Sequence, residues 1–220
     1  MTELKKRLIT SFFLIVLLLL MYLYNYILII FIIIISLIVW VEFFGIISKI
    51  FNKNDLKNKI FRFIYKSLSL IYLSLLSFVI VLIFLTDNDY KFFAIFSLFV
   101  AIASDIGGMV FGKFFKGRKL TKISPKKTIS GSIGAFLFSI LLIFFFNQNF
   151  ENYPFIAILF FTLTVSFISQ IGDLFISYLK RKAKVKNTSD ILPGHGGFLD
   201  RIDGIIFAVP FGIFLSKFLI

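Results

Sequence analysis

The chain alternates between long apolar runs and short polar connections. A helix needs about 20 mainly apolar residues to cross the hydrocarbon core of a bilayer. By that measure the pattern predicts seven spans, at about 8–24, 26–46, 67–86, 92–112, 129–147, 154–179 and 203–219. Only Tyr24 and Asn25 separate the first two runs, and the last run is only just long enough. We therefore expect an all-α fold, a polytopic transmembrane helical bundle of about seven spans.

The N-terminal part carries two further patterns. Segment 47–66 mixes apolar with basic residues, which predicts a basic amphipathic helix in the membrane interface. The basic cluster at 5–7 resembles a signal peptide, but no small-residue cleavage site follows, so 8–24 is interpreted as a retained span. We divide the chain into N-terminal transmembrane helices, 1–90, and a C-terminal transmembrane region, 91–220, that holds the candidate chemistry.

Composition agrees with a membrane protein. Hydrophobic residues make up 59% of the 220 residues, Phe occurs 33 times, and the mean hydropathy is +0.99. A soluble globular chain is about 45–50% apolar. A domain of this size has too little interior to hide the excess, so a soluble fold is excluded.

The positive charge predicts the orientation. Segments 1–7, 47–66, 113–127 and 180–201 hold 22 of the 24 Lys and Arg residues, and with seven spans they fall on one side. Positive loops mark the cytoplasmic side, so we expect the N-terminus in the cytoplasm and the C-terminus outside. Such loops also attract anionic headgroups. Because the charge is divided among short loops with no folded module to present it, we expect no nucleic-acid partner.

Cysteine and histidine usage limits the chemistry. The chain has no Cys and a single His, His195. These counts exclude disulfides, thiolate nucleophiles, Cys-ligated metal centres and multi-His metal sites. A metal would have oxygen ligands, which favours Mg²⁺ or a similar hard cation.

Two acidic residues, Asp105 and Asp173, stand inside apolar runs. A charge at the centre of a span costs at least about 2.5–3.5 kcal/mol, and neither has an opposite charge at helical spacing deep in its own run. Polar residues at three- and four-residue steps make one face of the second helix polar: Ser166, Ser169, Asp173, Ser177, Lys180 and Arg181. A packing seam of small hydroxyls explains the serines. It does not explain Asp173, for which function and an interhelical ion pair are the alternatives.

The most informative stretch is the connection 192–203. Pro193 and three glycines disfavour regular helix and allow backbone N–H groups to approach a ligand closely. Asp200 is either a helix N-cap, with Asp203 supporting the first turn, or a metal ligand. Arg201 could hold a phosphate with its fork of donors.

A third cluster lies in segment 104–128. Its glycines and Lys113 approach a phosphate-binding P-loop, but Phe114 stands where Ser or Thr is required and no strand precedes, so we reject that match. The spacing of Gly108 and Gly112 predicts close helix packing. The basic residues that follow suit a polyphosphate: Lys113, Lys116, Arg118, Lys119 and Lys122.

Together these groups suit phosphorus transfer at a membrane surface. Carboxylates can hold Mg²⁺, basic loops can hold a triphosphate, and a lipid phosphate can approach from the bilayer. Such transfer needs mostly positioning and charge stabilisation. A phosphomonoester nucleophile is already largely ionised near pH 7, so no strong general base is required.

Two motifs carry a family resemblance. Ser177-x-x-Lys180-Arg181, then Lys186, then Pro193-Gly194-His195-Gly196-Gly197-x-x-Asp200-Arg201-x-Asp203 is similar to the signature of phosphatidate cytidylyltransferases, also called CDP-diacylglycerol synthases. Asp105-x-Gly107, Gly112-Lys113 and Ser124-Pro125-x-Lys127-Thr128 resemble a second family segment in the right order. Arg7-Leu8-Ile9 and Trp40-Val41-Glu42 are weaker similarities. The specific resemblance covers roughly 104–203.

The resemblance implies a reaction in which CTP and phosphatidate give CDP-diacylglycerol and pyrophosphate. It implies Mg²⁺ as the cofactor, often together with a monovalent cation such as K⁺. It implies metal ligands at Asp173 and Asp200 and a supporting role for Asp203. Phosphate contacts are implied for Lys180, Arg181, His195 and Arg201, and substrate contacts for Asp105, Lys113, Ser124, Lys127, Thr128, Ser177 and Lys186. It also implies a homodimer and a bacterial inner (plasma) membrane protein whose active site faces the cytoplasm.

The chain departs from the family pattern at several positions. Asn187 stands where the family usually has Asp, and Ser130 where it has Glu or Gln. Ile106 and Met109 replace a typical Thr and Tyr. Three alternatives therefore stay open: a transporter that uses the two intramembrane aspartates, a CTP-dependent enzyme for another lipid phosphate, and a degenerate relative with a structural role.

Overall fold

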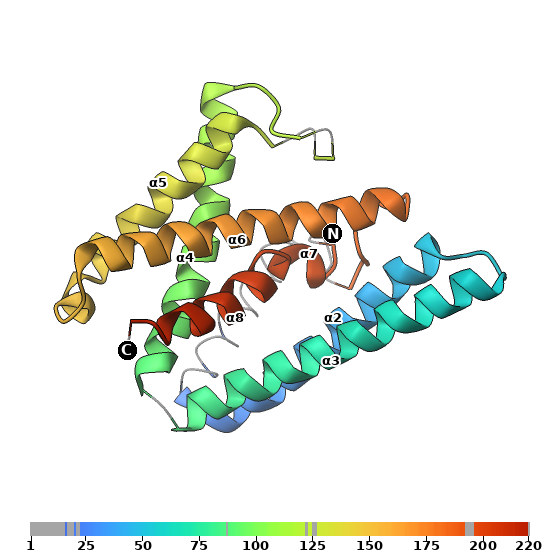
Figure 1. Ribbon diagram of the computed structural model, residues 1–220, viewed down its shortest axis with the longest axis horizontal. Coiled ribbons are helices and arrows are strands. Elements are labelled where there is room, and N and C mark those ends of the chain that lie inside the picture. Colours follow the sequence, from blue (N-terminus) through green and yellow to red (C-terminus); the bar gives the residue numbers. More distant parts are fainter. Residues whose placement is uncertain are drawn as a thin grey trace. The chain divides into compact units, whose positions relative to one another are not determined.

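The computed structural model describes residues 16, 20, 23–86, 88–121, 123–124, 127–191 and 196–219. The described residues form helices and no β-strand, which confirms the all-α expectation. The helices are α2 (Asn25–Ile50), α3 (Leu56–Thr86), α4 (Asn88–Phe115), α5 (Ile129–Phe145), α6 (Phe155–Lys182), α7 (Leu199–Ile202) and α8 (Ile205–Ser216), with a 3-10 turn, η1 (Asn147–Phe150) (Figure 1).

Four helices are long and apolar enough to cross a membrane by length and composition. These are Tyr26–Ile50, Leu56–Leu85, Asp89–Phe115 and Phe155–Lys182. The expected spans 129–147 and 203–219 correspond to shorter apolar helices, α5 and α8. The expected first span, 8–24, lies almost entirely outside the described residues.

The expected interfacial helix over 47–66 does not form as a separate element. Helix α2 continues to Ile50, a short connection follows, and α3 begins at Leu56 and runs without a break to Thr86. Phe51 stacks on Phe61 and Tyr65, with ring centroids 5.7 and 5.5 Å apart. These contacts use the apolar residues of the segment to close a helical hairpin. Its basic residues therefore belong to the end of α2, to the connection and to the first turns of α3.

The described residues group into two compact units. The first comprises 1–87 and 179–201, and the second comprises 88–178 and 202–220. The connection 179–201 thus groups with the N-terminal helices, whereas the sequence division placed it in the region 91–220.

In the first unit, α2 and α3 pack against each other along their length (Figure 1). Both are apolar on nearly all sides and largely exposed, as lipid-facing helices are. Trp40 on α2 donates its indole N–H to the carbonyl oxygen of Lys66 on α3 at 3.2 Å. An indole buried against a neighbouring helix needs such a partner, so this bond fixes the register of the pair.

In the second unit, α4, α5, α6 and α8 enclose an aromatic core. Phe93 and Phe96 on α4 and Phe161 on α6 are fully buried, and Phe150 from η1 packs among them. The ring centroids of Phe96 and Phe150 lie 4.9 Å apart in an edge-to-face arrangement, which aromatic pairs prefer. This core leaves the other ends of α4 and α6 to carry the polar residues of the site.

Candidate functional site

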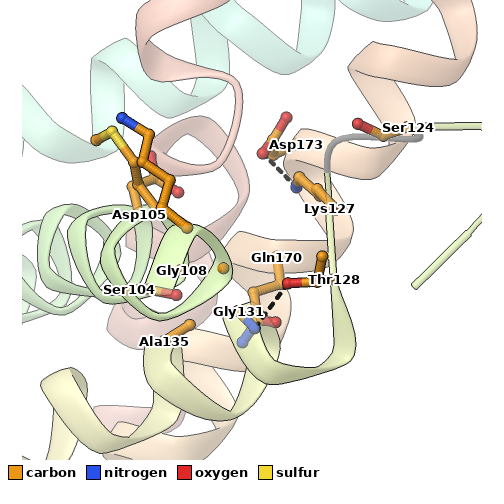
Figure 2. Close-up of a pocket in the computed structure, with 13 residues that line it drawn as sticks. Ser104, Asp105, Gly108, Ser124, Lys127, Thr128, Gly131, Ala135, Gln170 and Asp173 are labelled. Carbon is orange, nitrogen blue, oxygen red and sulfur yellow. Dashed lines mark hydrogen bonds and ion pairs between the residues drawn. The ribbon is translucent and has the colours of Figure 1, made fainter. Parts of the chain in front are cut away.

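A cavity of about 590 Å³ lies in the second unit, among α4, the start of α5 and α6 (Figure 2). Six of the residues selected from the sequence line it: Asp105, Lys113, Ser124, Lys127, Thr128 and Asp173. The rest of its wall includes small residues and two polar side chains, Ser104 and Gln170. The second sequence motif therefore gathers around one space with Asp173, which is distant from it in the sequence.

Close packing of glycines on α4 and α5 builds one wall of the cavity. A Cβ atom at Gly131 would lie 2.8 Å from the carbonyl oxygen of Gly108 and 3.5 Å from the Cα atom of Gly112. Any larger residue would force the two backbones apart. The structure confirms the interpretation of Gly108 and Gly112 as a helix-packing face.

Thr128 begins α5. Its hydroxyl accepts a hydrogen bond from the backbone N–H of Gly131 at 3.0 Å, which makes it the N-cap of the helix. The connection before it folds back on itself, with the N–H of Leu120 donating to the carbonyl oxygen of Lys127 at 2.8 Å. Thr128 thus has a structural role and, as a lining residue, also faces the cavity.

Asp173 forms an ion pair with Lys127 across the cavity (Figure 2). Both side chains stay partly exposed, at 22% and 26%. The hydroxyl of Ser177, one turn further along α6, donates to Asp173 at 3.3 Å. Asp173 therefore does form an ion pair, which was one of its two expected roles. Because neither charged group is buried, a ligand can still reach both.

The cavity contains oxygen ligands of the kind that a hard cation takes. Asp105 and Asp173 both line it, and carboxylate oxygens are the ligands that Mg²⁺ takes. No group of three or more acidic or His residues that could hold a metal occurs among the described residues. A cation held by two carboxylates would complete its shell with water and substrate phosphate oxygens, as Mg²⁺ usually does.

The serines on the polar face of α6 pack against other helices. Ser166 donates to Ser104 of α4 at 3.1 Å, and both are buried. A Cβ atom at Gly204, just before α8, would lie 2.5 Å from the hydroxyl oxygen of Ser169. This confirms the packing seam for the two serines, while Asp173, further along the same face, reaches the cavity instead.

Gln170 is a cavity residue that the sequence reasoning missed. Its carbonyl oxygen accepts a hydrogen bond from Ser132 at 2.5 Å, but its buried amide nitrogen has no partner among the described residues. A buried donor without a partner costs about 1–3 kcal/mol. The signal was present in the sequence as an amide inside an apolar run, three residues before Asp173.

The signature connection in the first unit forms its own network. Lys180 donates to Asp200 Oδ1 at 2.7 Å, and both side chains are largely buried, at 13% and 11% exposed. Asp200 Oδ2 accepts from the backbone N–H groups of Thr188 at 2.8 Å and Gly197 at 3.2 Å. Gly196 adopts φ +83°, the left-handed region that suits glycine, and so lets the chain turn beside this carboxylate.

These contacts lower the pKa of the Asp200 carboxyl. Burial by itself would raise the pKa of this carboxyl, but hydrogen bonds from Lys180 and the Thr188 backbone outweigh it and hold the pKa below its ordinary value. Both oxygens already accept hydrogen bonds. A role for Asp200 as a metal ligand stays a prediction, and the second lone pair of Oδ1, which among the described residues accepts only from Lys180, would be the site for it.

The remaining selected residues are more scattered. Arg181, Lys186 and Arg201 are exposed in the first unit. Asp203 is buried in the second unit, where it accepts from the N–H of Gly204 at 3.1 Å beside the start of α8. His195 lies outside the described residues.

Comparison with known proteins identifies the family. Residues 2–219 match the Cytidylyltransferase family, and the chain belongs to it. Relatives named phosphatidate cytidylyltransferase occur in Rickettsia felis, 44% identical over 61% of this chain and 63% of the relative, and in Bacillus subtilis, 40% identical over 58% and 49%. A Helicobacter pylori protein of the same name is 42% identical over 51% of this chain and 42% of the relative. The match covers less than two thirds of the length of these relatives.

Proposed function

We propose that this chain transfers CMP from CTP to phosphatidate, giving CDP-diacylglycerol and pyrophosphate. The observation that carries the proposal is the cavity of the second unit, which is lined by Asp105, Lys113 and Asp173 on long apolar helices and by Lys127 from the connection before α5. The family and the names of the relatives supply the nucleotide and the lipid acceptor. The cavity supplies charges of both signs, which a metal–triphosphate complex needs.

The reaction requires an oxygen of the phosphatidate phosphate to bond to the α-phosphorus of CTP. The bond from that phosphorus to the bridging oxygen of the β-phosphate breaks, and pyrophosphate leaves. The acceptor is already largely ionised near pH 7, so the protein has mainly to hold both phosphates in line and offset their charge.

The cavity residues can perform both tasks. Lys127 and Lys113 present ammonium groups to phosphate oxygens, and Lys127 can exchange its contact with Asp173 for one with the substrate. Asp173 and Asp105 would hold Mg²⁺, which supplies charge neutralisation on the phosphates when bound. The buried amide nitrogen of Gln170 has no partner among the described residues, and it could donate to a substrate oxygen if the side chain turned toward the cavity that it lines.

We also propose that the site opens to the cytoplasm. Three long helices end in basic residues: α2 with Lys49, α4 with Lys113, and α6 with Lys180, Arg181 and Lys182. Basic ends favour the cytoplasmic side and also complement the negative helix C-terminus. CTP, a cytoplasmic nucleotide, would meet the site from that side.

The test uses purified protein in detergent with Mg²⁺, CTP labelled in the α-phosphate, and phosphatidate. We expect label in a lipid product and one pyrophosphate released for each product formed. Thr164→Val provides a matched control on α6, because the Thr164 hydroxyl donates to the Phe160 carbonyl of its own helix. Labelling of a polyprenyl phosphate in place of phosphatidate would reassign the acceptor, and no labelled lipid with any acceptor would refute the proposal.

A further inference from the structure

Glu42 is the single acidic residue of α2, within an otherwise apolar helix. Its side chain is only 3% exposed. With 26 residues, α2 is about 39 Å long, which exceeds the roughly 30 Å of a bilayer core, and Glu42 lies about two turns before its end. A buried carboxylate in such a helix is costly, so its contacts must compensate.

Within the described part of the chain, four hydrogen bonds reach Glu42, and their donors are Thr188, Ser189, Phe198 and Leu199. Oε1 accepts from the Ser189 hydroxyl at 2.6 Å and from the backbone N–H of Phe198 at 3.0 Å. Oε2 accepts from the Thr188 hydroxyl at 2.8 Å and from the backbone N–H of Leu199 at 2.8 Å. The donors lie on both sides of 192–195, so one carboxylate ties together the two ends of the signature connection.

The same network includes Asp200. The Thr188 hydroxyl lies 2.8 Å from Glu42 Oε2 and 3.1 Å from Asp200 Oδ2, and its single proton can serve one carboxylate at a time. The close approach needs a glycine at 197. A Cβ there would collide with the Thr188 hydroxyl and lie 2.6 Å from Glu42 Oε2. Glycine at this point of the signature therefore makes room for a side chain from a distant helix.

We propose that Glu42 is a positioning residue, which holds Thr188 and Ser189 together with Phe198 and Leu199, where the turn that carries Asp200 begins. It touches no reacting atom in this assignment. It acts through the backbone N–H groups of Phe198 and Leu199, which begin the turn carrying Asp200 and Arg201. Its effect on turnover rests on the proposed function, whereas its effect on the conformation of the connection does not.

The carboxylate form is required by the geometry. Each oxygen accepts from one hydroxyl and one backbone N–H. In Glu42→Gln the new NH₂ group must face one of the two backbone N–H donors, whichever way the amide turns. A hydroxyl can rotate to accept, but a backbone N–H cannot. Glu42→Asp keeps both acceptor oxygens and shortens the reach by one methylene, so it should retain part of the function.

The first measurement is hydrogen–deuterium exchange of the full chain in detergent, read in peptides that contain Phe198 and Leu199. We expect these amides to exchange roughly 10-fold faster in Glu42→Gln, with a smaller increase in Glu42→Asp. Ser36→Ala is the matched control on α2, because the Ser36 hydroxyl donates to carbonyls of its own helix. Exchange in α5 peptides reports whether the rest of the fold is intact.

The second measurement is label transfer by the same variants, with KM and kcat determined separately. We expect kcat to fall roughly 10-fold or more in Glu42→Gln and to recover partly in Glu42→Asp. Where Glu42→Gln does not fold, the double variant Thr188→Val/Ser189→Ala removes both hydroxyl donors without altering α2 and should also speed exchange at Phe198 and Leu199.

The outcomes separate the two proposals. Unchanged exchange at Phe198 and Leu199 in a folded Glu42→Gln protein would overturn the positioning role. So would unchanged exchange in the double variant. Faster exchange in a chain whose wild-type form transfers no label would uphold the positioning of the connection and refute the proposed reaction instead.

Discussion

The acidic residues of the cavity in the second unit and those of the signature connection in the first unit differ in how completely they are hydrogen-bonded. In the cavity, Asp173 has a partly exposed lysine partner, and the Gln170 amide nitrogen has no partner among the described residues. In the connection, Asp200 and Glu42 both accept hydrogen bonds on each oxygen. Polar groups that are incompletely satisfied can still bind a ligand, whereas saturated groups hold the chain in place.

This difference predicts separate tasks for the two motifs. The cavity residues are suited to contact substrate and cation. The acids of the connection are suited to fix a backbone on which other groups are presented. Substitutions in the cavity should therefore lower the rate of label transfer, whereas substitutions in the connection should lower the stability of the fold.

The largest effect is expected for Asp173→Asn. The change removes the charge that pairs with Lys127 and that would hold a cation, so kcat/KM for label transfer should fall about 1,000-fold. Thermal unfolding in detergent should change little, because the side chain is partly exposed. A protein that unfolds much more easily but transfers normally when folded would place Asp173 among the structural acids.

Lys127→Met should lower transfer about 100-fold, mostly through weaker binding of the phosphate groups. Lys127→Arg should restore part of the activity, because it keeps the charge with a different geometry. The measurement is KM for CTP in the three proteins. Equal KM values in wild type and Lys127→Met would remove this lysine from the binding surface.

Asp200→Asn should mainly alter stability, in a manner that depends on pH. The folded pKa of Asp200 lies below its ordinary value of 3.8, so its ionised form stabilises the fold above that value and this contribution is lost as pH falls through the folded pKa. Thermal unfolding from about pH 6 to pH 3 should therefore show wild type and Asp200→Asn converging toward the acid end. A difference in Tm that does not change with pH would contradict the saturated network.

Gln170→Leu should have the smallest effect. Loss of one neutral hydrogen bond donor to substrate should raise KM by about 2- to 10-fold. The folded protein should be as stable as wild type or more so, because a buried amide nitrogen without a partner is removed. Ser132→Ala is the companion variant, since it removes the hydroxyl that orients the amide. A fall in stability with unchanged KM would make Gln170 a packing residue.

Apolar run length was sufficient to predict the long described helices, but not where each of them begins and ends. The run 47–66 had the composition of an interfacial helix, yet Phe51 stacks on Phe61 and Tyr65 and closes a hairpin in its place. Segment 179–201 groups with α2 and α3, and Glu42 on α2 contacts residues of this segment that are more than 140 positions away. Periodicity within one segment carries no information about such a partner.

The sequence also identified most of the cavity, for physical reasons. Asp105 and Asp173 stood out because charge is costly in an apolar run, and Gly108 and Gly112 because small residues allow helices to approach. Gln170 was missed because a neutral amide is a weaker signal, and its importance appears only when Ser132 is seen to fill one side of it. The role of Glu42 depends on four donors from one distant connection, which only the fold brings together.

The most direct test of the account compares CTP labelled in the α-phosphate with CTP labelled in the γ-phosphate, using wild type, Asp173→Asn and Thr164→Val. The account predicts that the α-label enters the lipid, that the γ-label leaves as pyrophosphate, and that Asp173→Asn loses both while Thr164→Val keeps both. Label from the γ-phosphate in the lipid would show phosphoryl transfer instead. Transfer of the α-label at the wild-type rate by Asp173→Asn would contradict the cavity as the site of reaction.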